Sequence, residues 1–280
     1  MFGRRLWGTI VLGAIGVWGC EPSRSPVDSG ETDEVGAGGI GGGDASVPSA
    51  GGAPSFDPTD GGAGGGEVIA EPTPTTIVLL IPGTTIVGAY FDDMAARLRE
   101  DGFEPVVFEP PDLFTESLAI GAQRISREID EVLAAAGARK LHIVAECNGG
   151  VATRYLMQVL GGSERVDQLV TFVSAHHGTW LSPVGDWATG YASLEDITPG
   201  SAFLEELNAA PFPTNLHMTS IYSCNDELMF PYETSVVDGA TNVLFCDYYV
   251  GHFDGFWDPV VYDRILASLE GRGDEAPTYY

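Results

Sequence analysis

Cys147 stands where this sequence has the pattern of a reactive turn. The segment KLHIVAECNGGVATRYL (140–156) leads from an apolar, β-branched stretch through Gly149-Gly150 into a helical pattern. Such a pattern predicts a strand, a tight turn and a helix, with the thiol at the apex of the turn and open to a substrate. The free N–H groups at the start of the helix point at the same place, where they favour negative charge. These features indicate a nucleophile.

A nucleophile of this kind needs a base, and the base needs an acid that orients it. Asp226 follows the strand-like segment MTSIYS (218–223), and His252 follows the strand-like segment TNVLFCD (241–247). In a doubly wound sheet, such groups belong on loops at the carboxyl ends of strands. The chain order is therefore nucleophile, acid and histidine.

Strand-like and helix-like segments alternate along most of the chain, which predicts a doubly wound, mainly parallel sheet flanked by helices. The predicted strands are 75–83, 105–108, 141–145, 167–175, 218–223 and 241–247. The predicted helices are 90–102, 117–137, 151–160 and 260–271. The short span between 177 and 201 leaves room for only a small cap over the site.

Several motifs, in the right order, resemble those of the small bacterial triacylglycerol lipases and esterases of the α/β-hydrolase fold. The resemblance covers about residues 76–268. The segments that carry it are IPGTT (81–85), the elbow AECNG (145–149), SAHHGTW (174–180), SAFLEELN (201–208), SCNDELMFPYETSVVDGATNV (223–243) and VGHF (250–253). It implies an α/β-hydrolase fold and hydrolysis of carboxylic esters.

The same resemblance implies a role for each matching residue. Cys147 is then the nucleophile, His252 the base and Asp226 its partner, and the backbone N–H groups of Thr84 and Asn148 form the oxyanion hole. This chain departs from the family at two places. Pro82 replaces the usual histidine before Gly83, and Ala145 and Cys147 replace the glycine and serine of the usual G-x-S-x-G elbow. Dienelactone hydrolases resemble this chain in using a cysteine on the same fold.

Other residues compete for some of these roles. Glu227 and Asp254 are alternatives to Asp226. Glu146 occupies the variable position of the elbow, with tuning of Cys147 as the alternative. We expect His176 and His177 to be structural or to line the pocket. The aromatic residues at positions 180, 191 and 203 belong either to an acyl pocket or to the core, namely Trp180, Tyr191 and Phe203.

The composition limits the class of protein. The 280 residues with 44% hydrophobic content are enough for one well-packed domain. The net charge is −27, and from residue 74 onward 30 acidic and 10 basic residues leave −20. Such a surface repels phosphate backbones, which excludes nucleic acid as the expected partner.

The sequence has no nucleotide-binding loop, HExxH motif or paired CxxC motif, so we expect no cofactor and no metal.

The first 73 residues are expected to lie outside the fold. Residues 1–20 have the charge and the apolar run of a signal peptide, and Val17-Trp18-Gly19-Cys20 resembles a bacterial lipobox. Cys20 is then a lipidated N-terminus and the membrane anchor of an exported cell-envelope lipoprotein; the alternative is a secreted soluble protein. Residues 21–73 read as a disordered linker, 74–272 as the hydrolase domain and 273–280 as a tail.

Three cysteines remain if Cys20 carries the anchor. Cys224 and Cys246 end neighbouring predicted strands, so a disulfide between them is geometrically plausible in an oxidising compartment. Cys147 is then a free thiol, as a nucleophile must be.

The predicted reaction is hydrolysis of a carboxylic ester through an acyl-enzyme. Two alternatives remain open. One is a catalytically silent surface lipoprotein that binds acyl chains or a partner through a degenerate pocket. The other is a thioesterase or acyltransferase that uses the same cysteine.

Overall fold

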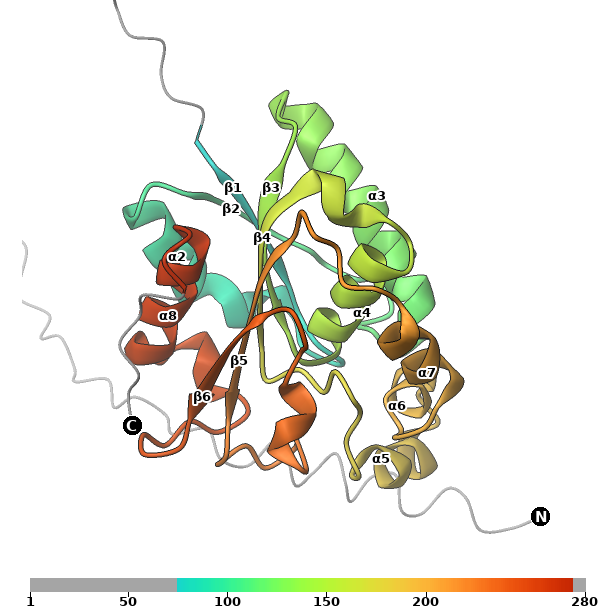
Figure 1. Ribbon diagram of the computed structural model, residues 1–280. Coiled ribbons are helices and arrows are strands. Elements are labelled where there is room, and N and C mark those ends of the chain that lie inside the picture. The colour runs from blue at the N-terminus through green and yellow to red at the C-terminus, as the bar shows by residue number, and fades with distance from the viewer. Residues whose placement is uncertain (1–74, 274–280) are drawn as a thin grey trace, which may run out of the picture. The chain divides into compact units, whose positions relative to one another are not determined.

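The computed structural model describes residues 75–273, and the predicted signal peptide, linker and most of the tail lie outside this range. The described part is a parallel sheet of six strands between two layers of helices (Figure 1). The strands are β1 (Ile77–Ile81), β2 (Glu104–Val107), β3 (Leu141–Glu146), β4 (Val166–Phe172), β5 (His217–Ser223) and β6 (Thr241–Phe245). The helices are α2 (Asp92–Glu100), α3 (Leu118–Ala136), α4 (Cys147–Gln158), α5 (Ser182–Thr189), α6 (Ala192–Asp196), α7 (Ala202–Ala209) and α8 (Pro259–Leu269).

The sheet is apolar on both faces, as a parallel sheet covered by helices must be. Alternate residues of β1 point to opposite sides. Leu79 packs with the helices α3, α4 and α7, whereas Leu80 packs with α2 and α8. The two helical layers therefore bury two separate hydrophobic clusters against a single sheet.

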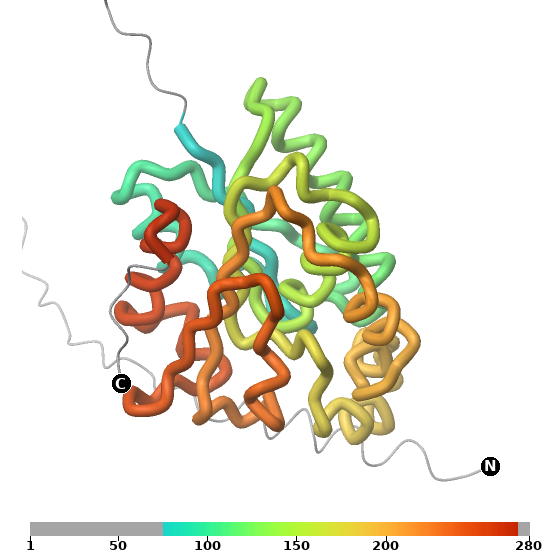
Figure 2. The backbone as a smooth tube through the Cα atoms, in the orientation of Figure 1, coloured from blue at the N-terminus to red at the C-terminus, as the bar shows by residue number. Residues whose placement is uncertain are grey.

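Helices α2 and α8 are far apart in the sequence but lie side by side on one face of the sheet (Figure 2). The hydroxyl of Tyr262 on α8 donates to Asp101 at the end of α2 over 2.6 Å. The guanidinium of Arg97 on α2 donates to the carbonyl of Trp257 over 2.9 Å. These contacts hold α8, and so the preceding loop that carries His252, against α2.

The strand order, β2-β1-β3-β4-β5-β6, changes direction between β1 and β3. In open α/β sheets, ligands bind at such a switch point, outside the carboxyl ends of the strands. The pairing aligns these ends, because Ile81 lies opposite Ala145, and Glu146 lies opposite Phe172. The turns that follow β1 and β3 therefore meet at the switch point.

The predicted doubly wound fold is confirmed, and the main differences lie in the helices. Helix α4 begins at Cys147 itself rather than after the glycine pair, so the thiol belongs to the first turn of the helix. The span expected to hold a small cap contains two short helices, α5 and α6. Among the described residues, no helix is long and apolar enough to cross a membrane.

A disulfide joins Cys224 and Cys246, whose Cα atoms are 5.2 Å apart, as the sequence predicted. Ser223 at the end of β5 pairs with Phe245 at the end of β6, so the bridge closes the edge of the sheet just past this pair. Asp226 follows two residues later. The disulfide thus fixes the base of the loop that presents Asp226.

We expect the double variant Cys224→Ser/Cys246→Ser to be less stable than the wild type by about 3 kcal/mol. The bridge lowers the conformational entropy of the unfolded chain by joining residues 22 positions apart. Thermal unfolding under non-reducing conditions should show a melting temperature lower by about 6 to 12 °C. Cys147→Ser, which leaves the bridge intact, is the control. An unchanged melting temperature in the double variant would contradict a disulfide in solution.

Candidate active site

Cys147 lies at a sharp turn between β3 and α4. Its φ of 48° falls in the left-handed region, which is uncommon for a residue other than glycine. Two glycines permit the turn to approach the loop after β1. A Cβ on Gly149 would lie 2.3 Å from the carbonyl oxygen of Pro82, and a Cβ on Gly83 would lie 2.7 Å from the Cβ of Cys147. The strained turn holds the half-buried thiol at the carboxyl ends of β1 and β3, where the strand order changes direction.

Asp226 and His252 meet at the same edge of the sheet. The ring Nδ1 of His252 lies 3.0 and 2.9 Å from the two carboxylate oxygens of Asp226, and both side chains are buried. Backbone N–H groups of Leu228 and Met229 also donate to Asp226 Oδ1, over 2.8 and 3.0 Å. The carboxylate is therefore fixed in place, and it orients the ring so that Nε2 faces the elbow.

The two competing carboxylates have other roles. Glu227 is exposed, and its Oε2 accepts the backbone N–H of His252 over 3.1 Å. Asp254 accepts the backbone N–H of Gly251 over 2.7 Å. Both stabilise the loop that carries His252, and neither takes the position that Asp226 occupies beside Nδ1.

The loops that carry the predicted oxyanion donors are tied to each other. The side-chain amide of Asn148 donates to Thr84 Oγ1 over 2.8 Å, and this hydroxyl donates to the carbonyl of Phe114 over 3.0 Å. The backbone N–H of Asn148, at the start of α4, acts to lower the pKa of the Cys147 thiol. The start of α4 and the loop after β1 thus form one unit around the thiol.

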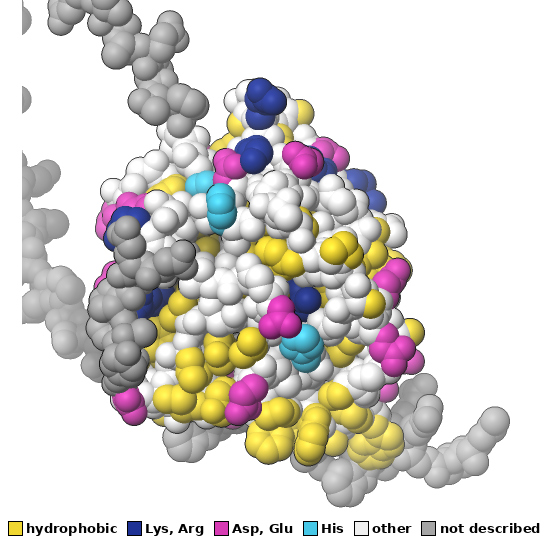
Figure 3. All heavy atoms as spheres, viewed as in Figure 1, with side chains coloured by type: hydrophobic (Ala, Val, Ile, Leu, Met, Phe, Trp, Pro, Cys, Tyr) yellow, Lys and Arg dark blue, Asp and Glu magenta, His cyan; other side chains and the backbone are white. Residues whose placement is uncertain are grey.

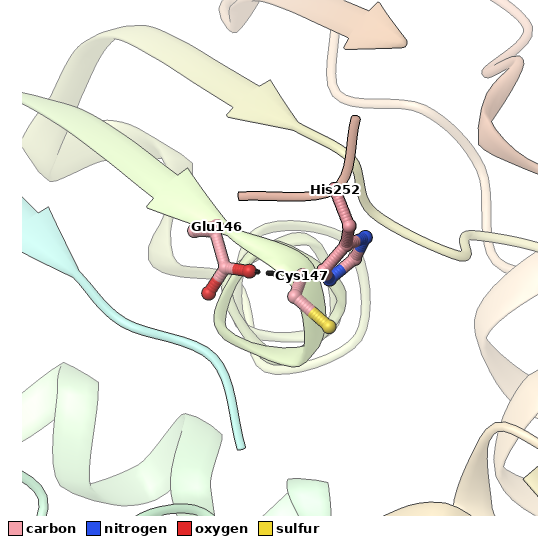
Figure 4. Close-up of side chains that lie close together, drawn as sticks. All are labelled: Glu146, Cys147 and His252. Atoms are coloured by element: carbon pink, nitrogen blue, oxygen red, sulfur yellow. Dashed lines mark ion pairs between the residues drawn. The ribbon is translucent and has the colours of Figure 1, made fainter. Parts of the chain in front are cut away.

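Glu146 is the residue whose importance the sequence analysis underestimated. Its side chain is only 1% exposed, and Gly83 donates its N–H to Oε2 over 2.7 Å. Its other oxygen, Oε1, lies 3.4 Å from His252 Nε2 (Figure 4). The signal for this role was an acidic residue at the end of a largely apolar strand, directly before Cys147. Two carboxylates, Asp226 and Glu146, therefore flank opposite sides of one imidazole.

This arrangement raises the pKa of both titrating groups, for different reasons. Burial raises the pKa of Cys147, and the negative charge of Glu146 raises it further, while His252 and the N–H of Asn148 act to lower it. Burial acts to lower the pKa of His252, but the sulfur of Cys147 and the hydrogen bond to Asp226 raise it well above its usual range. The two groups therefore compete for one proton: burial and Glu146 favour it on the sulfur of Cys147, whereas Asp226 supports it on the ring of His252.

His176 and His177 hydrogen-bond to residues other than Cys147, Asp226 and His252. His176 is buried, and its Nε2 lies 3.1 Å from Thr171 Oγ1. Burial holds the pKa of His176 well below its usual range, so it stays neutral. His177 is exposed and hydrogen-bonded to the carbonyl of Val236.

The three aromatic candidates for an acyl pocket separate into different environments. Phe203 is buried and stacks on Tyr155 with the ring centroids 4.6 Å apart, so it belongs to the core. Tyr191 is partly buried at the start of α6. Trp180 is 65% exposed and is the one that faces outward.

No protein-family model matches the chain. Among solved structures, it is similar to lipase BlEst2 of Bacillus licheniformis in its mature form, with a TM-score of 0.60 and 13% identity over 71% of this chain and 93% of that chain. It is similar to lipase B of Aspergillus fumigatus, with a TM-score of 0.58 and 16% identity over 70% of this chain. The chain spans only about half of that lipase, 52%.

A third similar structure is MGS-MChE2, an α/β-hydrolase enzyme from the metagenome of lagoon sediments at Mar Chica, Morocco. Its TM-score is 0.52, with 16% identity over 71% of this chain and 92% of that chain. Together with the parallel sheet and its strand order, these similarities establish the α/β-hydrolase fold.

Alkylation of Cys147 by iodoacetamide should accelerate at a higher pH than alkylation of an ordinary thiol, because only the thiolate reacts and the site raises the thiol pKa. The variant Glu146→Gln removes the nearby negative charge and keeps an oxygen to accept the N–H of Gly83. We therefore expect its rate profile to move to lower pH, as measured by mass spectrometry of the peptide that contains Cys147.

Glu227→Gln is the matched control for this measurement, since Glu227 contacts the backbone of His252. Its profile should match that of the wild type. A Glu146→Gln profile that coincides with the wild type, or moves to higher pH, would show that Glu146 does not oppose ionisation of Cys147.

Proposed function

We propose that the protein hydrolyses carboxylic esters through a covalent acyl-thioenzyme at Cys147. The observation that carries the proposal is the meeting of Cys147, His252 and Asp226 at the carboxyl edge of the sheet, beside the switch point between β1 and β3. The similarity in fold to lipases and to another α/β-hydrolase supports the same class of reaction.

The reaction proceeds in two acyl transfers. In the first, the thiol proton passes to Nε2 of His252, the sulfur attacks the ester carbonyl carbon, and Asp226 stabilises the imidazolium. The oxyanion accepts hydrogen bonds from the backbone N–H groups of Asn148 and Thr84. Each of these bonds stabilises the transition state by about 3 kcal/mol. The tetrahedral intermediate then collapses, and the alkoxide leaves with the proton from His252.

The second transfer releases the acid. His252, again neutral, takes a proton from water, and the hydroxide attacks the thioester carbonyl. The carbon–sulfur bond breaks, the sulfur regains a proton from His252, and the carboxylic acid departs. Each step uses the same ring nitrogen, which is why the orientation imposed by Asp226 on the opposite nitrogen matters to both transfers.

An exposed apolar surface, which Phe230 connects to the loop that presents Asp226, supports substrates with apolar acyl or alkyl groups. We call the side chains of Trp180, Leu181, Val184, Trp187 and Phe230 the α5 patch; all are exposed, and Trp187 is 76% exposed. The rings of Trp180 and Phe230 meet edge to face at 6.1 Å. Hydrophobic side chains gather at the lower edge of the molecule, in the region of α5 (Figure 3). Exposed apolar patches of this kind commonly mark binding surfaces.

The first prediction from this proposal concerns the nucleophile. The purified protein should hydrolyse p-nitrophenyl esters, and Cys147→Ala should lower kcat/KM by about a thousandfold or more, because no acyl-thioenzyme forms. Treatment with iodoacetamide should abolish the same activity.

His252→Ala should cause a comparable loss, whereas His177→Ala, a variant of an exposed histidine outside the site, should retain activity. A wild-type protein without turnover that gains it in Cys147→Ser would instead indicate a silent binding protein. Turnover that survives both alkylation and Cys147→Ala would rule out Cys147 as the nucleophile.

The second prediction concerns the α5 patch. Trp187→Ser should lower kcat/KM by about tenfold for a long-chain p-nitrophenyl ester, because about 1.4 kcal/mol of apolar contact is lost. The value for the acetate ester should change little, since its acyl group has little apolar surface to bury against the patch. Leu160→Ser, at an exposed apolar residue outside the patch, is the control. Equal losses on both esters would contradict a role of the patch in substrate binding.

A further inference from the structure

The Oε1 oxygen of Glu146 is buried and has no role in the proposed hydrolysis. Within the described residues this atom accepts no hydrogen bond, although the side chain is only 1% exposed, and it forms an ion pair with His252 Nε2, 3.4 Å away, only when that ring is protonated. A buried carboxylate oxygen is costly to leave without a partner. It faces the ring of His252 (Figure 4), and one donor atom from each of Glu146, Cys147 and His252 lies within 4.8 Å of the other two.

These three donors have the chemistry of a site for a thiophilic divalent cation. A thiolate, an imidazole and a carboxylate are the ligands that zinc takes in proteins, commonly as three side chains plus a water molecule. Cations that prefer oxygen, such as Mg²⁺, do not favour a set with sulfur and nitrogen. The donor set therefore selects zinc over the hard cations.

The spacing agrees with zinc coordination. Zinc binds nitrogen and oxygen ligands at about 2.0 to 2.1 Å, so two such ligands at a tetrahedral angle lie about 3.4 Å apart. Glu146 Oε1 and His252 Nε2 are 3.4 Å apart. This distance is long for a strong hydrogen bond but fits a pair that shares a metal ion. The sulfur completes the set when it comes within about 3.6 Å of both atoms, given a zinc–sulfur distance of about 2.3 Å.

Surrounding contacts already orient two of the ligands. Asp226 binds Nδ1 of His252 and leaves Nε2 for the metal, which is the carboxylate–histidine pairing common around protein-bound zinc. The N–H of Gly83 holds Oε2 of Glu146, so that Oε1 faces the ring. A metal ion thus requires little rearrangement of His252 or Glu146.

We propose that Glu146, Cys147 and His252 form a reversible zinc site. On binding, the thiol loses its proton to solvent, His252 binds through neutral Nε2, and a water molecule takes the fourth position. No group is oxidised or reduced. Zinc occupies both the nucleophile and the base, so it inhibits acyl transfer; this consequence rests on the proposed function, whereas metal binding does not.

Binding is tested directly on the purified full-length protein, without reference to activity. Co²⁺ should produce a thiolate-to-cobalt charge-transfer band that Zn²⁺ abolishes by competition. Zinc affinity measured by isothermal titration should fall at least tenfold in Glu146→Gln and about 10- to 100-fold in Asp226→Asn, in line with the loss of a ligand and of its orienting partner. Zn²⁺ should also protect Cys147 from iodoacetamide in the wild type.

The controls separate this site from other thiols and carboxylates. Cys20→Ser and Glu206→Gln should bind zinc as tightly as the wild type, whereas Cys147→Ala should lose the charge-transfer band. A band that persists in Cys147→Ala, or zinc affinity unchanged in Glu146→Gln, would overturn the proposal. If Glu146→Gln fails to fold by circular dichroism, protection of Cys147 from alkylation in the wild type decides the question, and no protection overturns the site.

Zinc binding without esterase activity would support the metal site and reject the proposed function. Esterase activity that zinc leaves unchanged, together with a failure of Zn²⁺ to displace Co²⁺, would retain the proposed function and reject the metal site. The two proposals therefore fail separately.

Discussion

The sharp turn at Cys147 is the constraint on which the rest of the site depends. Strand β3 must end and helix α4 must begin at one residue, in a left-handed conformation that a side chain rarely adopts. The pairing of β3 with β1 and β4 fixes the end of the strand before the turn. The close approach of Gly149 to the backbone of Pro82 fixes the start of the helix after it. Without that support, the backbone would relax and the thiol would leave the switch point.

The electrostatics of the site follow from placing two carboxylates around one imidazole. Asp226 fixes the ring and supports its positive charge, as a proton-transfer base requires. Glu146 adds a second negative charge on the side of the thiol and so opposes the formation of thiolate. The site thus combines features that the proposed acyl transfer requires with one that keeps the thiol of Cys147 protonated. A cation between Glu146 and Cys147 would reverse that balance, since it favours both negative groups.

The sequence predicted the fold because its signals are local. Buried parallel strands read as continuous apolar runs, and the positions of the six strands were predicted to within a few residues. The helices α5 and α6 were not predicted individually, because they are short and lie between glycines and prolines; their positions depend on packing. Thr84, on the loop after β1, contacts Ser193 on α6 through their hydroxyls over 3.3 Å, a contact between residues 109 apart in the chain.

By itself, the sequence determined the parallel α/β architecture, and it predicted the order Cys147, Asp226 and His252 and a plausible disulfide between Cys224 and Cys246. Strand patterns, turn glycines and residue types suffice for these. Only the tertiary structure distinguished Asp226 from its neighbour Glu227, because the choice depends on which carboxylate faces Nδ1. Only it revealed the position of Glu146, because the contact with His252 joins residues more than a hundred positions apart, and no local pattern encodes that distance.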